Sequence, residues 1–223
     1  MSREIPIIFN SDMVRAILAG QKTQTRRPVN GINPERLTET LSKAQLAKVK
    51  RELPESFGVS YFCPFGQPGD LLWVRETFSE AGGNAPELML YRANYPGHVI
   101  SDSRGYENIP PATAIKWRPS IHMPRWASRI LLRVTAVRVE RVQDITDAAA
   151  IAEGVGSGHY IEDGWYWKDW RLSDEEAAVS PMLESARESF RSLWESIYGN
   201  WDANPWVWVI EFERVTDSKR EAA

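Results

Sequence analysis

The sequence predicts one α+β domain, a small β-barrel or curved sheet with surrounding helices and long inserted loops. Three observations favour this class. Several short segments alternate between apolar and polar residues, few segments have helical periodicity, and no repeat or linker divides the 223 residues. A chain of this length fills one hydrophobic core or two small ones. We therefore expect a single domain over residues 1–223, with insertions at about 29–60, 94–127 and 155–180.

The first elements are predicted to be a strand, a helix and a second strand. Residues 5–9 form a short apolar run, and Asn10 or Ser11 can cap the helix that follows. Gly20 is a suitable residue to end that helix. Residues 22–27 alternate and contain two threonines, which indicates a strand.

The middle of the chain combines an insertion, two strands and a loop. A polar helix is expected at about 35–53, inside the first insertion. Turn residues at 64–70 lead into a strand over 71–78, and another strand is expected over 87–92. The proline-rich residues 94–127 predict a long ordered loop, which in a compact domain is usually functional.

The last third is predicted to hold the longest strand, two helices and a closing strand. Residues 130–142 alternate clearly and indicate a long strand, bent in its middle. Thr146 can cap a short helix that runs through Glu153 and ends at Gly154. A longer helix is expected from residues 180–181 to Gly199, followed by a strand over 206–215.

Composition and charge narrow the class of protein. The net charge of −3 argues against a general DNA-coating protein. Cys63 is the only cysteine, so an intrachain disulfide is impossible, which agrees with a reducing compartment. No window approaches the roughly 18 consecutive apolar residues of a membrane helix, and the apolar run near the start is too short for a signal peptide. We expect a cytoplasmic protein without a membrane partner, and we favour a monomer.

The charges are distributed unevenly along the chain. Residues 116–141 carry seven basic residues and one acid, Glu140, which gives 7 − 1 = +6. Residues 142–213 carry 15 acids and four basic residues, which gives 4 − 15 = −11. Such a chain can present one basic face to phosphate while it remains acidic overall. The alternative is that both blocks are ordinary solvated surface.

The segment GQKTQTRR, residues 20–27, is the strongest candidate for a functional centre. Lys22 can act as a base if it is desolvated, and Thr25 can act as a nucleophile if a neighbour accepts its proton. Arg26 and Arg27 point to opposite faces in a regular strand. Strict alternation does not group Lys22 with Thr25, so the two converge only if Lys22 still belongs to the turn after Gly20. The alternative is an ordinary exposed strand.

Two further segments are candidates for binding a base or phosphate. Trp73 and Arg75 share one face of a predicted strand and can clamp such a group, although Arg75 paired with an acid is the alternative. The loop over 117–129 alternates aromatic and basic residues, a mixture used to bind single strands. Its candidate residues are Trp117, Arg118, His122, Arg125 and Trp126. His122 has no second His or Cys at ligand spacing, so neither a metal nor a cofactor is expected.

Four separated motifs occur in the same order as in a known family. ILAGQKTQTRR resembles the signature of the ASCH-domain family, a PUA-like β-barrel group linked to RNA. PGDLLWVRET (residues 68–77), RVTAVRVERVQDITDAAAIAEG (133–154) and WVWVIEFE (206–213) resemble further strands and a helix of that family. The whole chain most resembles the longer form that is common in phages and prophages. The resemblance implies one ASCH/PUA-like domain with insertions.

The resemblance also implies an activity. Small bacterial members of the family are amidohydrolases that remove the acyl group from N(4)-acetylcytidine, with a Lys, a Thr and a Glu that match Lys22, Thr25 and Glu153. Thr25 would attack the amide carbonyl, Lys22 would accept its proton, and Glu153 would pass a proton to the leaving amine. Arg27 matches a family Arg that can orient the substrate. Other relatives imply alternatives: a non-catalytic RNA- or DNA-binding module, or a ribonuclease.

Overall fold

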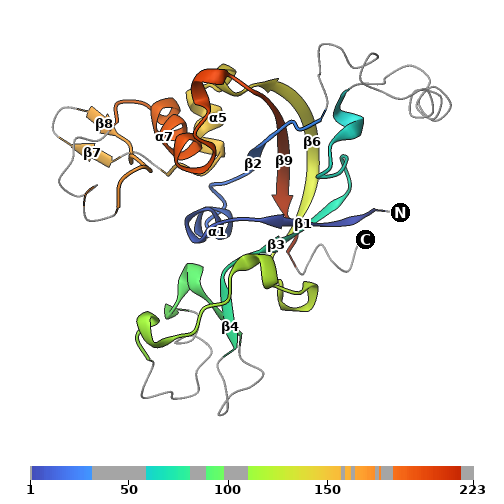
Figure 1. Ribbon diagram of the computed structural model, residues 1–223, viewed down its shortest axis with the longest axis vertical. Coiled ribbons are helices and arrows are strands. Elements are labelled where there is room, and N and C mark those ends of the chain that lie inside the picture. Colours follow the sequence, from blue (N-terminus) through green and yellow to red (C-terminus); the bar gives the residue numbers. More distant parts are fainter. Residues whose placement is uncertain are drawn as a thin grey trace.

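The computed structural model describes residues 2–31, 59–80, 89–97, 110–156, 159–161, 164–173, 176 and 183–216 (Figure 1). The helix expected at about 35–53 lies outside these residues, as do parts of all three expected insertions.

The central element is a five-stranded sheet, which confirms the α+β class. Its hydrogen-bonded order is β1 (Glu4–Ile8), β3 (Leu71–Arg75), β6 (Leu131–Arg141), β9 (Trp206–Arg214) and β2 (Gln24–Pro28). β1 and β3 are parallel, and the other neighbours are antiparallel. The register of β6 against β9 shifts between Val134 and Ala136, a bulge that agrees with the predicted bend. Figure 1 shows these two long strands curving together.

The first helix, α1 (Ser11–Leu18), connects the two edge strands of this sheet, β1 and β2. Asn10 is its cap, because Met13 N donates to Asn10 Oδ1 at 2.9 Å. Gly20 follows the helix with a φ of 73°. The prediction that a strand starts at Lys22 is wrong. Gln21 N and Lys22 N both donate to Ala16 O, at 2.9 and 3.1 Å, so the turn continues past Gly20 and β2 begins at Gln24.

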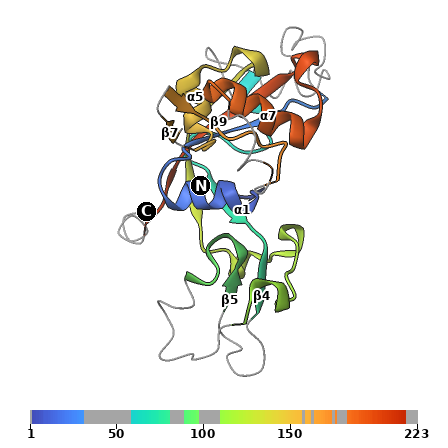
Figure 2. The ribbon, with the colours of Figure 1, turned by 90° about the vertical axis from the view of Figure 1, so that its left-hand side faces the viewer.

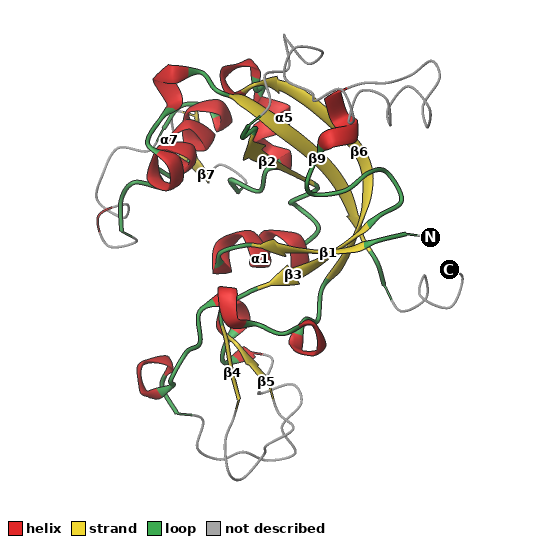
Figure 3. Cartoon of the chain, turned by 45° about the vertical axis from the view of Figure 1, so that its right-hand side comes forward, coloured by secondary structure: helices red, strands yellow, loops and turns green. Residues whose placement is uncertain are grey.

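The strand predicted over residues 71–78 is divided in two. β3 ends at Arg75, and β4 (Phe78–Glu80) pairs with β5 (Met89–Tyr91) in a separate two-stranded sheet. Between them, Glu76 is 1% exposed and accepts from Arg129 Nε at 2.9 Å and Nη2 at 3.0 Å. Figure 3 shows β4 and β5 extending away from the central sheet as a second lobe.

Short 3₁₀ helices connect these elements. In chain order they are Val59–Phe62, Arg92–Asn94, Ala112–Ala114, Ser120–His122, Arg125–Ala127, Val142–Asp144 and Trp201–Ala203. The second to fifth of these helices lie within or beside the β4–β5 lobe. The described part of the loop expected over 94–127 therefore contains several short 3₁₀ turns.

The C-terminal helices differ from prediction at one boundary. α5 (Asp147–Ala152) is capped by Thr146 as expected, and β7 (His159–Ile161) with β8 (Gly164–Tyr166) forms a hairpin. α7 (Ala186–Tyr198) begins after Ser185, which is later than predicted, and residues 180–181 lie outside the described residues. Leu183 forms a β-bridge with Trp167, and Ser185 has extended dihedral angles, so the chain is not helical at these two residues. Gly199 ends α7 with a φ of 62°, as predicted.

The main core lies between the sheet and the helices α1, α5 and α7. Met13 and Val14 of α1 and Trp194 of α7 pack in one cluster with strand residues such as Leu132 and Ile210. Figure 2 shows α1 lying between the β4–β5 lobe and the layer of α5 and α7. Among the described residues, no helix combines the length and apolarity needed to cross a membrane.

Candidate active site

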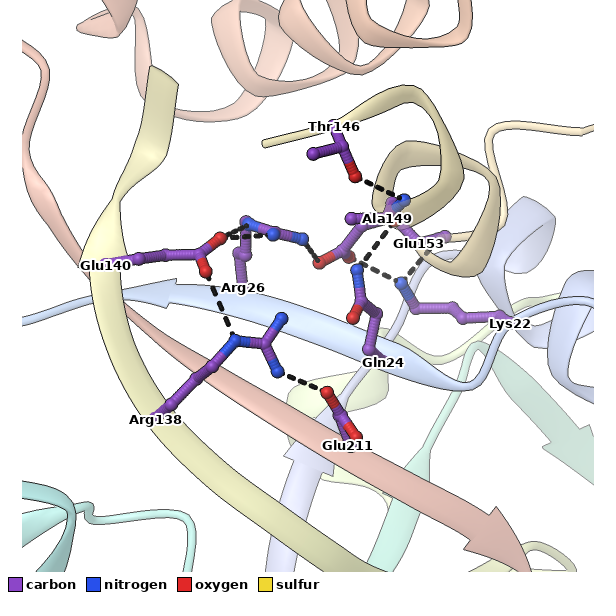
Figure 4. Close-up of polar contacts among 9 residues, drawn as sticks. All are labelled: Lys22, Gln24, Arg26, Arg138, Glu140, Thr146, Ala149, Glu153 and Glu211. Atoms are coloured by element: carbon purple, nitrogen blue, oxygen red, sulfur yellow. Dashed lines mark hydrogen bonds and ion pairs between the residues drawn. The ribbon is translucent and has the colours of Figure 1, made fainter. Parts of the chain in front are cut away.

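Three buried charged side chains meet where α1, β2 and α5 come together (Figure 4). Lys22 follows α1, Arg26 lies on β2 and Glu153 caps α5, with exposed fractions of 4%, 3% and 3%. Lys22 Nζ donates to Glu153 Oε2 at 2.9 Å and to the Glu153 backbone oxygen at 2.6 Å. Arg26 Nη1 donates to Glu153 Oε1 at 2.9 Å. Two basic side chains therefore share the Glu153 carboxylate.

Hydrogen bonds to backbone carbonyls at the end of α5 bring these residues together. Thr23 N donates to Ala152 O at 2.9 Å, and Gln24 Nε2 donates to Ala149 O at 2.6 Å. These bonds satisfy carbonyls at the end of α5 and hold the start of β2 against it. Gly154 follows with a φ of 83°, a conformation that favours glycine. The turn after α1 and the end of α5 thus form one packed unit.

Burial changes the ionisation of Lys22. Desolvation lowers the pKa of the Lys22 amine, and the nearby Glu153 carboxylate opposes this effect. The charges of Arg27 and Arg26 lower the pKa further, so the pKa of Lys22 lies below its ordinary value. A neutral lysine amine has two N–H groups and one lone pair. Glu153 Oε2 and the Glu153 backbone oxygen can accept these two N–H groups, which leaves the lone pair free to accept a proton.

Thr25 lines the same pocket as Lys22, Arg26, Arg27 and Glu153. It is 2% exposed, and within the described part of the chain its hydroxyl forms no hydrogen bond. The pocket has a volume of about 40 Å³, which holds a few water molecules or a small polar group but not a pyrimidine ring. The remaining walls are apolar and include side chains of α1 and α7.

A larger groove of about 450 Å³ adjoins this pocket and shares five lining residues with it: Phe9, Met13, Arg27, Ile197 and Tyr198. Its walls come mainly from β1, α1 and α7 and are mostly apolar. Arg27 donates to Ile8 O at 2.7 Å, and its guanidinium lies 5.2 Å from the Phe9 ring. Arg26 and Arg27 have different hydrogen-bond partners, but both line the inner pocket. Arg27 lies at the junction of the pocket and the groove.

A network of ion pairs that the sequence did not predict extends from Arg26 along the sheet (Figure 4). Arg26 Nε donates to Glu140 Oε1 at 3.0 Å, and Arg26 Nη2 also contacts this oxygen. Glu140 Oε2 accepts from Arg138 Nε at 3.2 Å, and Arg138 Nη1 contacts Glu211. The i, i+2 spacing of Arg138 and Glu140 on a predicted strand was the available signal, because such residues share a face.

The other predicted binding residues do not line this pocket. They lie along β3 and in the loop that covers the β4–β5 lobe: Trp73, Arg75, Trp117, Arg118, His122, Arg125 and Trp126. The guanidinium groups of Arg75 and Arg125 lie 5.6 and 6.0 Å from the Trp73 ring. Arg75 donates to the backbone oxygen of Ile121, whereas an acid was the alternative expected. The structure therefore divides the candidate residues into two separate groups.

Within this second group the aromatic residues differ in exposure. Trp126 is 70% exposed, and His122 is also exposed. Trp117 is half-buried, donates from Nε1 to Ala112 O at 2.9 Å, and packs edge-on against Tyr95. Trp126 is therefore the aromatic residue of this loop that is most available for stacking.

The basic block over residues 116–141 carries less uncompensated charge than its sequence count suggests. Five of its arginines form ion pairs: Arg118 with Glu80, Arg125 with Glu4, Arg129 with Glu76, Arg133 with Glu213, and Arg138 with Glu140 and Glu211. Apart from Glu140, which belongs to the block, these carboxylates come from β1, β4, β9 and the connection between β3 and β4. The block therefore resembles a paired surface more than a continuous face for phosphate.

A scan against models of protein families, a search of curated proteins and a search of solved structures each found no match. Within the described residues, no group of three or more His, Cys, Asp or Glu side chains is arranged to hold a metal ion. The resemblance to a family is therefore carried by the sequence motifs alone. The chemistry that the site can perform is inferred from the residues that line the pocket.

Proposed function

We propose that this chain is an ASCH-type, PUA-like protein that recognises nucleosides and hydrolyses the exocyclic amide of an N(4)-acylated cytosine. The observation that carries this proposal is the shared pocket of Lys22, Thr25 and Glu153, in which Lys22 Nζ lies 2.9 Å from Glu153 Oε2. The expectation of a small barrel is supported by the path of the chain. The short helix α1 connects the two edge strands of the curved sheet, which limits how far apart these edges can lie. The single cysteine supports a cytoplasmic location.

The reaction uses each member of this set. Neutral Lys22 accepts the proton of the Thr25 hydroxyl while Oγ1 forms a bond to the amide carbonyl carbon. Lys22 passes a proton to Glu153 through their hydrogen bond, and Glu153 delivers it to N4 as the C–N bond breaks. Water then hydrolyses the Thr25 ester, which releases the carboxylic acid and restores the hydroxyl. The net reaction converts an amide and water into an amine and an acid.

The two cavities suggest how the substrate lies. The inner pocket of about 40 Å³ fits the reacting amide group, whereas the groove of about 450 Å³ is of the size that binds a heterocycle with its sugar. Phe9 and Tyr198 supply aromatic surface in the groove, and Arg27 supplies a donor at the junction. We therefore place the base in the groove and the amide beside Lys22.

Hydrolysis of N(4)-acetylcytidine, followed by chromatography of cytidine, tests this function. Thr25→Ala, Lys22→Met and Glu153→Gln should each lower kcat by about 100-fold or more, the usual effect of losing a nucleophile or acid–base group. Thr135→Ala is a matched control, because Thr135 is an exposed strand threonine on β6. Absence of cytidine with the unmodified protein, or full activity in Thr25→Ala, would overturn the proposal.

A second candidate function, binding of single-stranded nucleic acid, is favoured by the surface around Trp126. The exposed Trp126 ring, together with Trp73 and the nearby guanidinium groups of Arg75 and Arg125, offers stacking surface and positive charge. A mobility-shift titration at two salt concentrations tests it.

Binding to this surface should weaken at the higher salt concentration and in Trp126→Ala, Arg118→Gln and Arg125→Gln. Absence of any shift at low salt would rule out this function. Labelled RNA in the same assay reports cleavage, which separates a ribonuclease from a binding module.

A further inference from the structure

Arg26 is a buried residue of the site that has no role in the proposed reaction. Its side chain is 1% exposed and lies beside the Glu153 carboxylate, whose two oxygens contact different cations. Oε1 accepts from Arg26 Nη1 and Oε2 accepts from Lys22 Nζ, both at 2.9 Å. On its other side, Arg26 is held by Glu140. Basic and acidic side chains therefore alternate from Lys22 through Glu153 and Arg26 to Glu140.

We propose that Arg26 is a positioning residue that holds the Glu153 carboxylate away from exclusive pairing with Lys22, so that the Lys22 amine can exist in its neutral, proton-accepting form. Glu140 moderates this effect, because it neutralises part of the charge on Arg26. The inference rests on the proposed function, in which Lys22 is the base. Arg26 acts through Glu153 and is not itself catalytic.

The surroundings of Lys22 support this role. From α5 it faces Glu153, and from β2 it faces Arg26 and Arg27. The Phe9 ring lies 5.5 Å from Nζ, and Tyr198 of α7 also lines the pocket. In a buried site such charges interact more strongly than in water. Glu153 is the one carboxylate among these groups, so competition for it decides how firmly Lys22 keeps its proton.

Two substitutions should act in opposite directions. Arg26→Gln removes a cation and leaves Glu153 to Lys22 alone, which should raise the pKa of the Lys22 amine. Glu140→Gln removes the anion that moderates Arg26, which should lower the pKa of the Lys22 amine further. A purely structural role for Arg26 does not produce two opposite shifts. Arg26→Lys keeps the charge without the second arm of the guanidinium, so it should move the pKa less than Arg26→Gln.

The experiment combines two measurements on the full chain. NMR titration with isotope-labelled lysine reports the pKa of Lys22 directly, with the spectrum of Lys22→Met used to assign its signal. The pH profile of kcat/KM for N(4)-acetylcytidine reports the same ionisation as the acidic limb. In Arg26→Gln this limb should move to higher pH, with a rate on the limb that falls about tenfold for each pH unit moved. In Glu140→Gln the limb should move to lower pH.

Arg129→Gln is the matched control, since it breaks another ion pair between an arginine and a buried glutamate, in the part of the chain that leads to the β4–β5 lobe. It should leave the Lys22 titration unchanged. If Arg26→Gln does not fold, Glu140→Gln and Arg26→Lys still test the inference. Shifts in the same direction for Arg26→Gln and Glu140→Gln, or no shift in either, would overturn it.

The two readouts also separate the inference from the proposed function. Opposite NMR shifts without hydrolysis by the unmodified protein would support the effect on Lys22 and reject the amidohydrolase. Hydrolysis with an unmoved Lys22 titration in the variants would support the amidohydrolase and reject the role of Arg26.

Discussion

Gly154 and Lys22 are in such close contact that a side chain at residue 154 has no room. A Cβ at Gly154 would lie 2.9 Å from Lys22 Cβ and 2.8 Å from Ala16 Cβ. Real Cβ atoms do not approach this closely, so the end of α5 could not keep its place against the turn after α1. The glycine that ends α5 is therefore also a requirement for the Lys22–Glu153 contact.

Gly154→Ala should destabilise the protein by about 2–4 kcal/mol, because it adds overpacking to the strain of a left-handed backbone. Urea unfolding measures this change. Gly199→Ala is the matched control: its φ is 62°, but a Cβ there meets nothing within 4 Å, so only the backbone strain of about 1 kcal/mol should appear. Equal losses in the two variants would contradict the steric explanation.

Lys22 should make stability rise with pH in the alkaline range. Its pKa in the folded protein is lowered, chiefly by burial, below the ordinary value of 10.5. Between these two values the unfolded chain binds more protons at this residue, so the free energy of unfolding increases with pH. Urea unfolding of the unmodified protein and Lys22→Met at two alkaline pH values should show a difference that grows with pH. A difference that stays constant or shrinks would contradict the lowered pKa.

Ile197 offers a test of the groove as the site of the base. It is 53% exposed on α7 and lines both cavities. Ile197→Trp should fill part of the groove and raise KM for N(4)-acetylcytidine several-fold, with a smaller effect on kcat and a change in stability within about 0.5 kcal/mol. Ile151→Trp is the control, because Ile151 is 44% exposed on α5 and lines neither cavity. An equal KM for both variants would place the base elsewhere.

Cys63 should report unfolding of the core. Burial raises the pKa of its thiol to about 11, and the residue is 4% exposed. Since the thiolate is the reactive form, a disulfide reagent at pH 8 should label the native protein at least about 100-fold more slowly than the protein in denaturant. Rapid labelling of the native protein would show that this part of the core opens readily.

The helix boundaries that the sequence predicted correctly depend on local chemistry. Asn10 and Thr146 each accept from a backbone N–H three residues later, and Gly20 and Gly154 adopt positive φ after a helix. Such signals lie within a few residues of the element that they bound, so they are visible in sequence. The start of α7 was missed because the Trp167–Leu183 bridge, between residues far apart in sequence, overrides a local helix signal.

For the site, the order of residues shows which chemical groups are available and that residues 20–27 carry most of them. The motif match also named Glu153, but the chain separates it from Lys22 by 131 residues. Only the tertiary structure brought the two into contact, placed Arg26 between Glu153 and Glu140, and paired the basic block with distant carboxylates. These contacts are not visible in the sequence, because ion pairs and burial depend on which strands and helices become neighbours. The order of strands in the sheet is in turn set by the packing of the whole chain.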